Sequence, residues 1–101
     1  MSEKTSDSSY QLPPTNAFNH AAKIAIVEDK PIMLDYWVDS LNSGSGVIVG
    51  VRENSEKLLV KSEDEYTSTI QKFYKSGTEY IIITENSIYL VSNDIPTRKI
   101  S

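Results

Sequence analysis

Two short runs rich in β-branched and aromatic residues, at positions 79–84 and 87–91, are separated only by Glu85 and Asn86. Ile, Val, Thr and Tyr favour extended strands. Asn tolerates the left-handed backbone conformation that a two-residue turn demands. The sequence therefore predicts an antiparallel β-hairpin at this position, and the fold must contain at least one β-sheet.

Further short strands are predicted upstream of this hairpin. The run at 22–28 has the β-branched content and partial alternation of a strand, and turn residues follow it at 28–31. In the segment 32–39, alternate residues form one face that suits a strand, namely Ile32, Leu34, Tyr36 and Val38. The alternative for this segment is a helix that begins near Pro31 and has one apolar stripe, formed by Met33, Tyr36, Trp37 and Leu41.

The segment 62–77 combines opposing signals. The residues at 62–65 match a capping box, and lysines follow the acidic residues, which favours a helix over about 63–75. The three residues at 67–69 are poor helix formers, and the apolar residues after them suit a strand that ends at the turn 75–78. We predict a strand here and keep the helix as the alternative.

The whole pattern is a series of short strands joined by short turns. Two more strands are expected at 47–51 and 57–61, and residues 97–101 form a basic tail or a last edge strand. This series predicts a mainly β fold, a small antiparallel meander that curls into an SH3-like or similar small barrel. The alternative is an α+β fold with one helix at about 63–75.

The first 20 positions differ in composition from the rest. They are rich in Ser, Asn, Thr and Pro and show neither helical nor strand periodicity. We therefore expect a disordered or extended N-terminal arm at 1–20 and one compact β-rich domain at 21–101, since 101 residues suit a single domain. Three apolar residues of the arm are candidates for docking on a neighbouring surface: Tyr10, Leu12 and Phe18.

Charge and missing residue types exclude several function classes. The chain has 10 Lys+Arg against 14 Asp+Glu and a net charge of -4, which disfavours binding of duplex nucleic acid. It has no Cys and only one His, which excludes disulfides, cysteine-type zinc sites and multi-histidine metal sites. No signal-peptide pattern or membrane-spanning apolar run is found. We therefore expect a cytoplasmic protein without a membrane partner.

Catalytic chemistry is not indicated either. The glycine-rich nucleotide motifs, the nucleophile elbow and the zinc-protease motif are all missing from the sequence. Asp35 and Asp39 are a pair of carboxylates, but on one strand they would lie about 13 Å apart, too far to share a proton or a metal ion. We expect a non-enzymatic protein with no cofactor and no metal site.

Trp37 is the first candidate for an interaction residue. On a strand it would lie on the face opposite the aliphatic residues, exposed or covered by another segment, and Asp35 and Asp39 flank it as in an interface hot spot. Together with the three arm residues, these side chains indicate a protein-binding or structural accessory protein in a larger assembly. Its partner would be another protein or copies of itself. The stretches 30–37 and 84–89 resemble segments of small phage or viral proteins.

The alternative function is a small barrel that binds a nucleotide-type ligand or single-stranded nucleic acid. This class includes an inhibitor that sequesters a ligand or blocks a protein surface. Arg52 and Asn86 are the candidate polar contacts to a small anionic ligand. Exposed aromatic residues could stack on bases, but single-strand binders combine such stacking with a basic groove, and here the lysines are interleaved with acidic residues.

Overall fold

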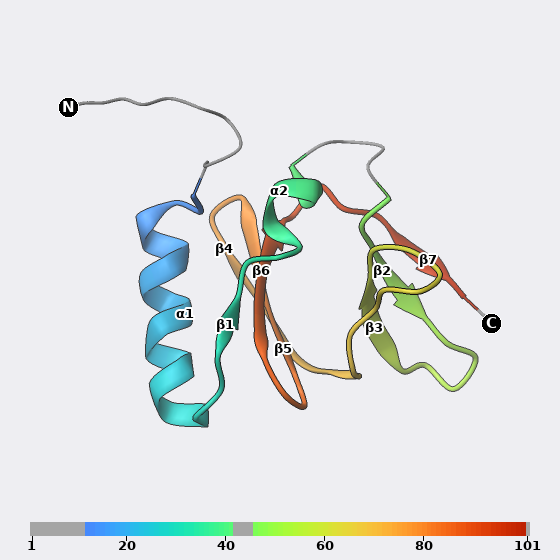
Figure 1. The fold of residues 1–101 in the computed structure, drawn as a ribbon, viewed down its shortest axis with the longest axis horizontal. Helices are drawn as coiled ribbons and strands as arrows, with labels where there is room; N and C mark the ends of the chain where they lie inside the picture. The colour runs from blue at the N-terminus through green and yellow to red at the C-terminus, as the bar shows by residue number, and fades with distance from the viewer. Residues whose placement is uncertain (1–11, 42–45, 101) are drawn as a thin grey trace.

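The computed structural model describes residues 12–41 and 46–100. In chain order its elements are α1 (Thr15–Glu28), β1 (Ile32–Met33), α2 (Trp37–Ser40), β2 (Ile48–Val51), β3 (Lys57–Val60), β4 (Ile70–Ser76), β5 (Glu79–Thr84), β6 (Ile88–Ser92) and β7 (Thr97–Lys99). Figure 1 shows α1 on one side of a central group of strands, with β2, β3 and β7 on the other. The fold is mainly β, as predicted.

The strands form two mixed sheets. One sheet has four strands in the order β1-β6-β5-β4, and the other has three in the order β3-β2-β7. Most neighbours are antiparallel, but β1 pairs with β6 and β2 pairs with β7 in parallel. The prediction of a purely antiparallel meander is therefore wrong, because two pairings join segments that are distant in sequence. The strands in the described part of the chain form no closed barrel.

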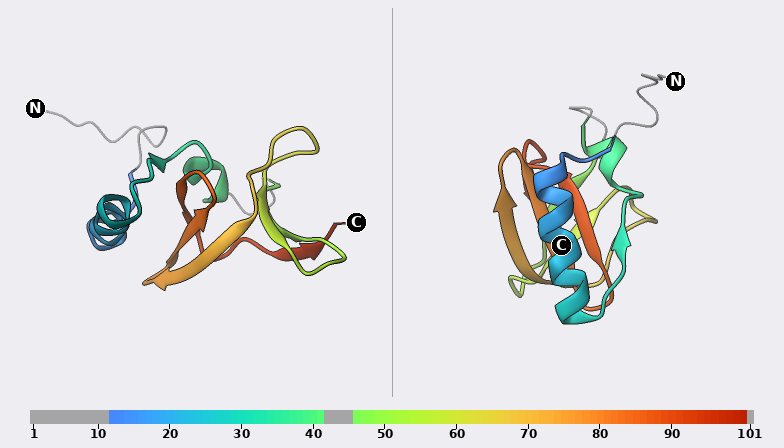
Figure 2. Two further views of the ribbon diagram at one scale, coloured as in Figure 1. Left: turned by 90° about the horizontal axis from the view of Figure 1, so that it is seen from below. Right: turned by 90° about the vertical axis from the view of Figure 1, so that its left-hand side faces the viewer.

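Two hydrophobic clusters lie on opposite faces of the four-stranded sheet. On one face α1 packs against β5 and β6, with Trp37 in the same cluster. On the other face the same two strands contact the three-stranded sheet through Val49 and Leu59. Figure 2 shows α1 lying across the first of these faces and β2, β3 and β7 beyond the second. The four-stranded sheet is thus the middle layer of three.

The middle position explains the run of three isoleucines in β5. Ile81 and Ile83 belong to the cluster on the α1 side, and Ile82 belongs to the cluster on the other side. All three side chains are fully buried. A strand with one wet face alternates apolar and polar residues, whereas a strand covered on both faces is apolar throughout. β5 is of the second kind.

The expected strand at 22–28 is wrong, because these residues are the second half of α1. The helix begins after Pro14 and ends at Asp29, whose left-handed backbone (φ 56°) caps it. Its buried stripe has helical spacing, consists of small or partly buried residues and crosses position 20: Ala17, Phe18, Ala21, Ile24 and Ala25. The boundary expected between positions 20 and 21 therefore falls inside the helix.

The segment 32–39 also differs from the predicted strand. Only Ile32 and Met33 are extended, and a short helix follows at Trp37–Ser40. The Ser40 hydroxyl donates to the Trp37 carbonyl (2.6 Å) and accepts from the Ser92 N–H (2.9 Å), so it holds this helical turn against β6. The alternative of a helix from Pro31 onward is correct only for this last turn.

For the segment 62–77 the predicted strand is confirmed and the helix alternative is wrong. β4 covers Ile70–Ser76. The capping-box hydrogen bond does form, since the Ser62 hydroxyl accepts from the backbone N–H of Glu65 (3.1 Å), but it closes a turn. The backbone of Leu59 bonds Thr67 in both directions, because its carbonyl accepts from the Thr67 N–H (2.9 Å) and its N–H donates to the Thr67 hydroxyl (3.1 Å). The strand pairing draws this segment out of a helix.

Candidate functional site

β4 forms an outer edge of the four-stranded sheet. It pairs with β5 on one side, and no strand in residues 12–41 and 46–100 pairs with its other side. The aromatic residues Phe73 and Tyr74 give this segment high strand propensity. They remain 39% and 40% exposed, whereas the three isoleucines of β5 are buried. The longest of the described strands is therefore also an open edge.

The other edge strands present fewer unpaired backbone groups than β4. β1 has two residues and β7 has three. The outer side of β3 is covered by the segment that follows it, through the Val60–Tyr66 bridge and the bond from the Lys61 N–H to the Glu65 carbonyl (2.9 Å). An uncovered row of N–H and C=O groups is a template for pairing with another chain. Among the described strands, β4 presents the longest such row.

The register of the hairpin β4–β5 identifies the outward backbone groups. Ser76 and Glu79 pair across a two-residue turn at Gly77 (φ 62°). In an antiparallel ladder, the residues whose backbone bonds the partner alternate with those whose backbone does not. Counting back from the turn, Phe73 and Lys75 direct their N–H and C=O groups away from β5. These two residues carry the free backbone of the edge.

The two faces of β4 have different surroundings. Phe73 packs edge to face on Tyr80, with ring centres 4.5 Å apart, on the side of the three-stranded sheet. Tyr74 lies on the opposite face, where its ring centre is 5.9 Å from that of His20 in α1. Because side chains alternate along a strand, Lys75 shares the face of Phe73. Each aromatic ring is fixed on one side and open on the other.

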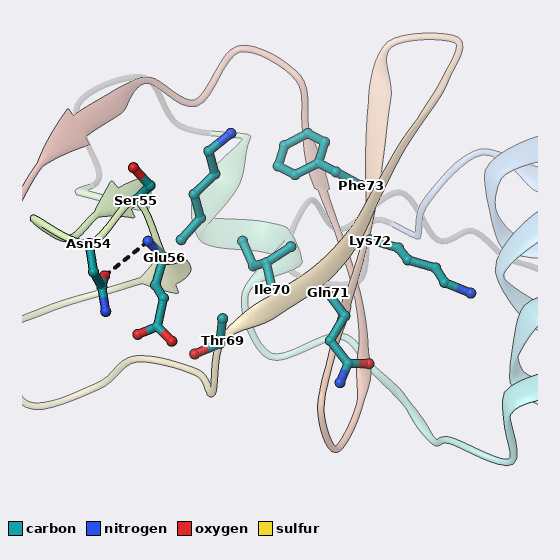
Figure 3. Close-up of a pocket in the computed structure, with 9 residues that line it drawn as sticks. Asn54, Ser55, Glu56, Thr69, Ile70, Gln71, Lys72 and Phe73 are labelled. Atoms are coloured by element: carbon teal, nitrogen blue, oxygen red, sulfur yellow. Dashed lines mark hydrogen bonds between the residues drawn. The ribbon is translucent and has the colours of Figure 1, made fainter.

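A groove of about 410 Å³ runs between this edge and the turn that joins β2 to β3. Figure 3 shows Ile70 and Phe73 on the side of β4 that faces the turn, and Lys72 directed the other way. The lining residues come from the turn and from the first half of β4: Asn54, Ser55, Glu56, Lys57, Thr69, Ile70, Gln71, Lys72 and Phe73. The groove therefore lies beside the free backbone of the edge.

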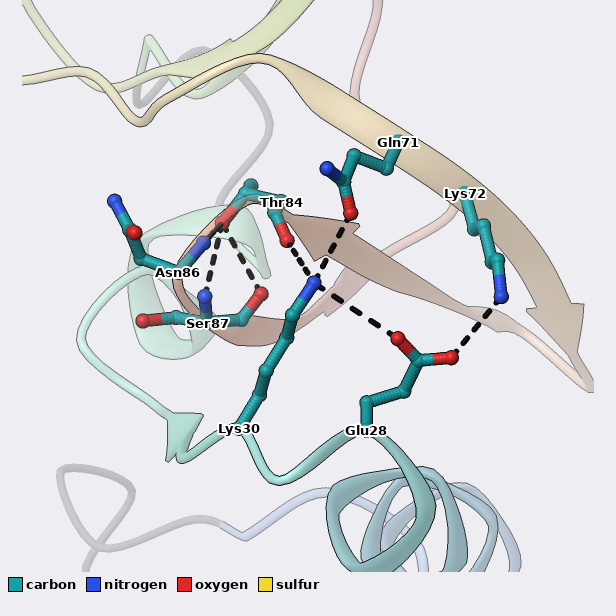
Figure 4. Close-up of polar contacts among 7 residues, drawn as sticks. All are labelled: Glu28, Lys30, Gln71, Lys72, Thr84, Asn86 and Ser87. Atoms are coloured by element: carbon teal, nitrogen blue, oxygen red, sulfur yellow. Dashed lines mark hydrogen bonds and ion pairs between the residues drawn. The ribbon is translucent and has the colours of Figure 1, made fainter.

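A polar network fixes the start of β4 against the end of α1 (Figure 4). The Lys30 ammonium donates to the Thr84 carbonyl (2.8 Å) and to the Gln71 side-chain oxygen (3.0 Å). The register of β4 shifts at Gln71, and such an extra residue interrupts the backbone ladder. Lys30 thus supplies a donor to Thr84 next to the point where the ladder is interrupted.

The same network includes an ion pair between the helix and the strand. Lys72 donates to the Glu28 carboxylate at 3.0 Å, and Lys30 lies 3.9 Å from the other carboxylate oxygen. The hydrogen bond from Lys72 lowers the pKa of Glu28 below its ordinary value and raises the pKa of Lys72. Both groups therefore stay charged across the neutral range, and they hold β4 to α1.

Trp37 is not a surface anchor. It is 3% exposed and belongs to the cluster under α1. The adjacent Tyr36 points into the opposite cluster, and burial raises the pKa of its hydroxyl to about 12. Trp37 and Tyr36 thus pack into the two different hydrophobic clusters, and Trp37, which was predicted to be an interface residue, is part of the core.

Asp35 and Asp39 both meet Lys61, which extends from the end of β3. Its ammonium donates to the Asp35 carbonyl (3.2 Å), pairs with the Asp39 carboxylate (3.2 Å) and lies 5.5 Å from the centre of the Tyr36 ring. The hydrogen bond to Asp39 raises the pKa of Lys61. These contacts connect the α2 region to the three-stranded sheet.

The candidates from the N-terminal arm are separated by the start of α1. Phe18 lies within the helix and packs against the first hydrophobic cluster, so it is a structural residue. Leu12 precedes the helix and is 69% exposed. Tyr10 falls outside the residues that the structure describes.

The candidate ligand contacts Arg52 and Asn86 lie in turns that belong to different sheets. Asn86 is exposed between β5 and β6, where its backbone N–H donates to the Thr84 hydroxyl (3.3 Å). Arg52 lines a second hollow of about 380 Å³ on the three-stranded sheet, next to Tyr66, Glu63 and Ile100. Tyr66 is 55% exposed there. Arg52 and the exposed ring of Tyr66 therefore line the same hollow.

In residues 12–41 and 46–100, no group of three or more His, Asp or Glu side chains is placed to hold a metal ion. Neither described helix is long and apolar enough to cross a membrane.

Comparisons with family models, with curated proteins and with solved structures find no match for this chain. The edge of β4 was not among the predicted site residues. Its sequence does carry a signal, because lysines are typical of a strand at the edge of a sheet.

Proposed function

We propose that this protein is a non-enzymatic, protein-binding accessory module of a larger assembly. It binds an extended segment of a partner protein, which adds as a fifth strand to the open edge of β4. The observation that carries this proposal is the seven-residue strand whose outer backbone has no partner strand in the described part of the chain. Strand addition draws its affinity from main-chain hydrogen bonds and its specificity from alternate side chains.

The surroundings of the edge support the same function. The groove of about 410 Å³ gives a place to the side chains that an added strand would project toward the β2–β3 turn. Phe73 and Tyr74 offer one aromatic ring to each face of that strand. The network of Lys30, Glu28 and Lys72 holds the edge in place before a partner arrives. Such preorganisation reduces the entropy cost of binding.

A proline substitution tests the proposal. Lys75→Pro removes an outward N–H without disturbing the ladder to β5, because proline is tolerated at edge positions whose N–H faces solvent. Lys99→Pro in β7 is the matched control: the neighbouring Ile100 N–H bonds Val51, so the Lys99 N–H points away from β2. Trp37 fluorescence verifies that both variants fold, since this buried residue is the single Trp of the chain.

The binding assay uses peptides selected on the wild-type protein from a displayed library of random ten-residue sequences. We expect Lys75→Pro to weaken the selected peptides at least tenfold and Lys99→Pro to leave their affinity unchanged. Equal binding to the wild type and Lys75→Pro places the site elsewhere and refutes the proposal. A library that yields no binder refutes it as well.

The second hollow supports one other candidate function, the binding of a small anionic ligand with a stacking ring. Arg52 supplies the charge and the exposed Tyr66 supplies the aromatic face. A ligand that binds the native state raises the melting temperature by mass action. A panel of mononucleotides and short oligonucleotides should then include a stabilising ligand whose effect is lost in Tyr66→Ala.

A further inference from the structure

The edge of β4 carries positive charge in a chain whose net charge is -4. Lys72 and Lys75 are the only charged residues between Ile70 and Ser76. Lys57 lines the adjacent groove, where Glu56 is the single acidic residue. The local sign is therefore opposite to that of the whole protein.

The lysines are not equivalent. Lys72 is paired with Glu28 at 3.0 Å, so its charge is already balanced on the α1 face. Lys75 and Lys57 make no ion pair with any residue in the described ranges. Both lie on the side of the three-stranded sheet, Lys75 by the alternation of β4 and Lys57 in the groove lining. On this side a ligand meets the ammonium groups of Lys75 and Lys57 and, in the groove lining, the carboxylate of Glu56.

An added strand has a fixed relation to these side chains. Strand side chains at alternate positions share one face, so the residues opposite Phe73 and Lys75 lie two positions apart on the groove side. The side chain opposite Phe73 would meet that ring and Ile70. Directly opposite positions are close enough for charge pairs to stabilise the sheet and for like charges to destabilise it.

We propose that the β4 edge selects an acidic extended segment, with an acidic side chain opposite Lys75 and an apolar side chain two positions away, opposite Phe73. This inference rests on the proposed function, because it names the partner chemistry of the same edge. A second copy of this chain is the competing occupant. It would bring two more lysines to an edge that already has two, and lysine at an edge strand opposes self-pairing.

Two blocked peptides test the proposal. One is Thr-Glu-Thr-Val-Thr-Glu-Thr, whose symmetric pattern places Val opposite Phe73 and Glu opposite Lys75 for either strand direction. The other has Lys in place of both Glu residues. Amide resonances of the isotope-labelled full chain report binding at each position of β4. The protein variants are Lys75→Gln and, as a matched control on the other sheet, Lys99→Gln.

At 20 mM salt we expect the Glu peptide to shift the β4 resonances and to bind about fivefold more tightly than the Lys peptide. The ratio of the two affinities should fall toward one at 500 mM salt, because exposed charges are screened. It should also fall toward one in Lys75→Gln, whereas Lys99→Gln should leave it unchanged. Equal binding of the two peptides at β4 overturns the acidic preference and leaves strand addition intact. The inference is also overturned if no resonance shifts, or if only resonances outside β4 shift. The library selection tests strand addition separately. If the β4 resonances broaden as the protein concentration rises and a dimer forms, the occupant of the edge is a second copy of the chain.

Discussion

Replacement of Lys30 by Met should destabilise the protein by about 2 kcal/mol. The Lys30 side chain is 14% exposed, and its ammonium donates to the Thr84 carbonyl at 2.8 Å and to Gln71 at 3.0 Å. A hydrogen bond with one charged partner contributes about 1.5–3 kcal/mol, and a buried acceptor left without a donor costs about 1–3 kcal/mol. Met keeps the length of the apolar chain, with a sulfur in place of the Cδ methylene, and removes the ammonium. Gln71 is exposed and can turn to water, so the loss of the Thr84 contact dominates.

Urea denaturation followed by Trp37 fluorescence measures this change, because Trp37 is the single Trp of the chain and is buried in the native state. Lys75→Met is the control: it deletes an exposed ammonium on β4 and should change the unfolding free energy by less than about 0.5 kcal/mol. The slopes of the two transitions should match that of the wild type. A loss below about 0.5 kcal/mol for Lys30→Met would refute the role assigned to Lys30, as would a loss equal to that of the control.

Three further predictions concern the core, a close contact and an ion pair. Ile82→Ala, at a fully buried position, should cost about 2–5 kcal/mol in urea denaturation, and a loss below about 1 kcal/mol would contradict its burial between two layers. A Cβ at Gly50 would lie 2.7 Å from the Ile100 Cδ1, the end of a side chain that can shift, and 3.1 Å from the Val60 Cγ2, so Gly50→Ala should cost at most about 1 kcal/mol, and Ile100→Ala should reduce that cost in a double-mutant cycle. The folded-state pKa of Glu28 lies below its unfolded value, so the stability difference between the wild type and Glu28→Gln should be full above about pH 4.5 and shrink as the pH falls through the lowered pKa. A difference that is constant from pH 7 to pH 2 would show that the pair with Lys72 does not contribute.

The elements that the sequence predicts correctly depend on local chemistry. The β5–β6 hairpin is predicted from the strand formers on either side of its turn, although Asn86 does not adopt the left-handed backbone expected there and the Thr84 hydroxyl instead accepts from the N–H groups of Asn86 and Ser87. β4 ends before Gly77, which does adopt the left-handed conformation. These signals lie within a few residues of one another. No distant contact is needed to interpret them.

The sequence does not predict α1, because the buried stripe of this helix contains alanines in place of large apolar residues. Ala17 and Ala21 are fully buried, yet Ala does not mark a hydrophobic stripe as Leu or Ile does. The β-branched residues Ile24, Ile26 and Val27 then suggested a strand, although Ile26 and Val27 are 82% and 80% exposed on the helix surface. Propensity is a weak guide where packing decides the outcome, and here packing on β5 and β6 selects the helix.

The candidate site was not predictable for a topological reason. Whether a strand is central or at an edge depends on which segments pair, and the parallel pairings β1–β6 and β2–β7 join residues far apart in sequence. β1 covers the outer side of β6, which leaves β4 as the open edge at the other end of the sheet.

The buried strand β5 supports the exposed edge strand β4. β5 is buried on both faces and paired on both sides, so it has no group left for a partner. β4 is held by β5 on one side and by Lys30 and Lys72 at its start, so its order does not require a partner. An edge that is ordered in advance loses little conformational freedom when a strand is added. For this reason the rigidity of the core and the affinity of the edge should be coupled, and Lys30→Met should weaken peptide binding at β4 although Lys30 lies outside the groove.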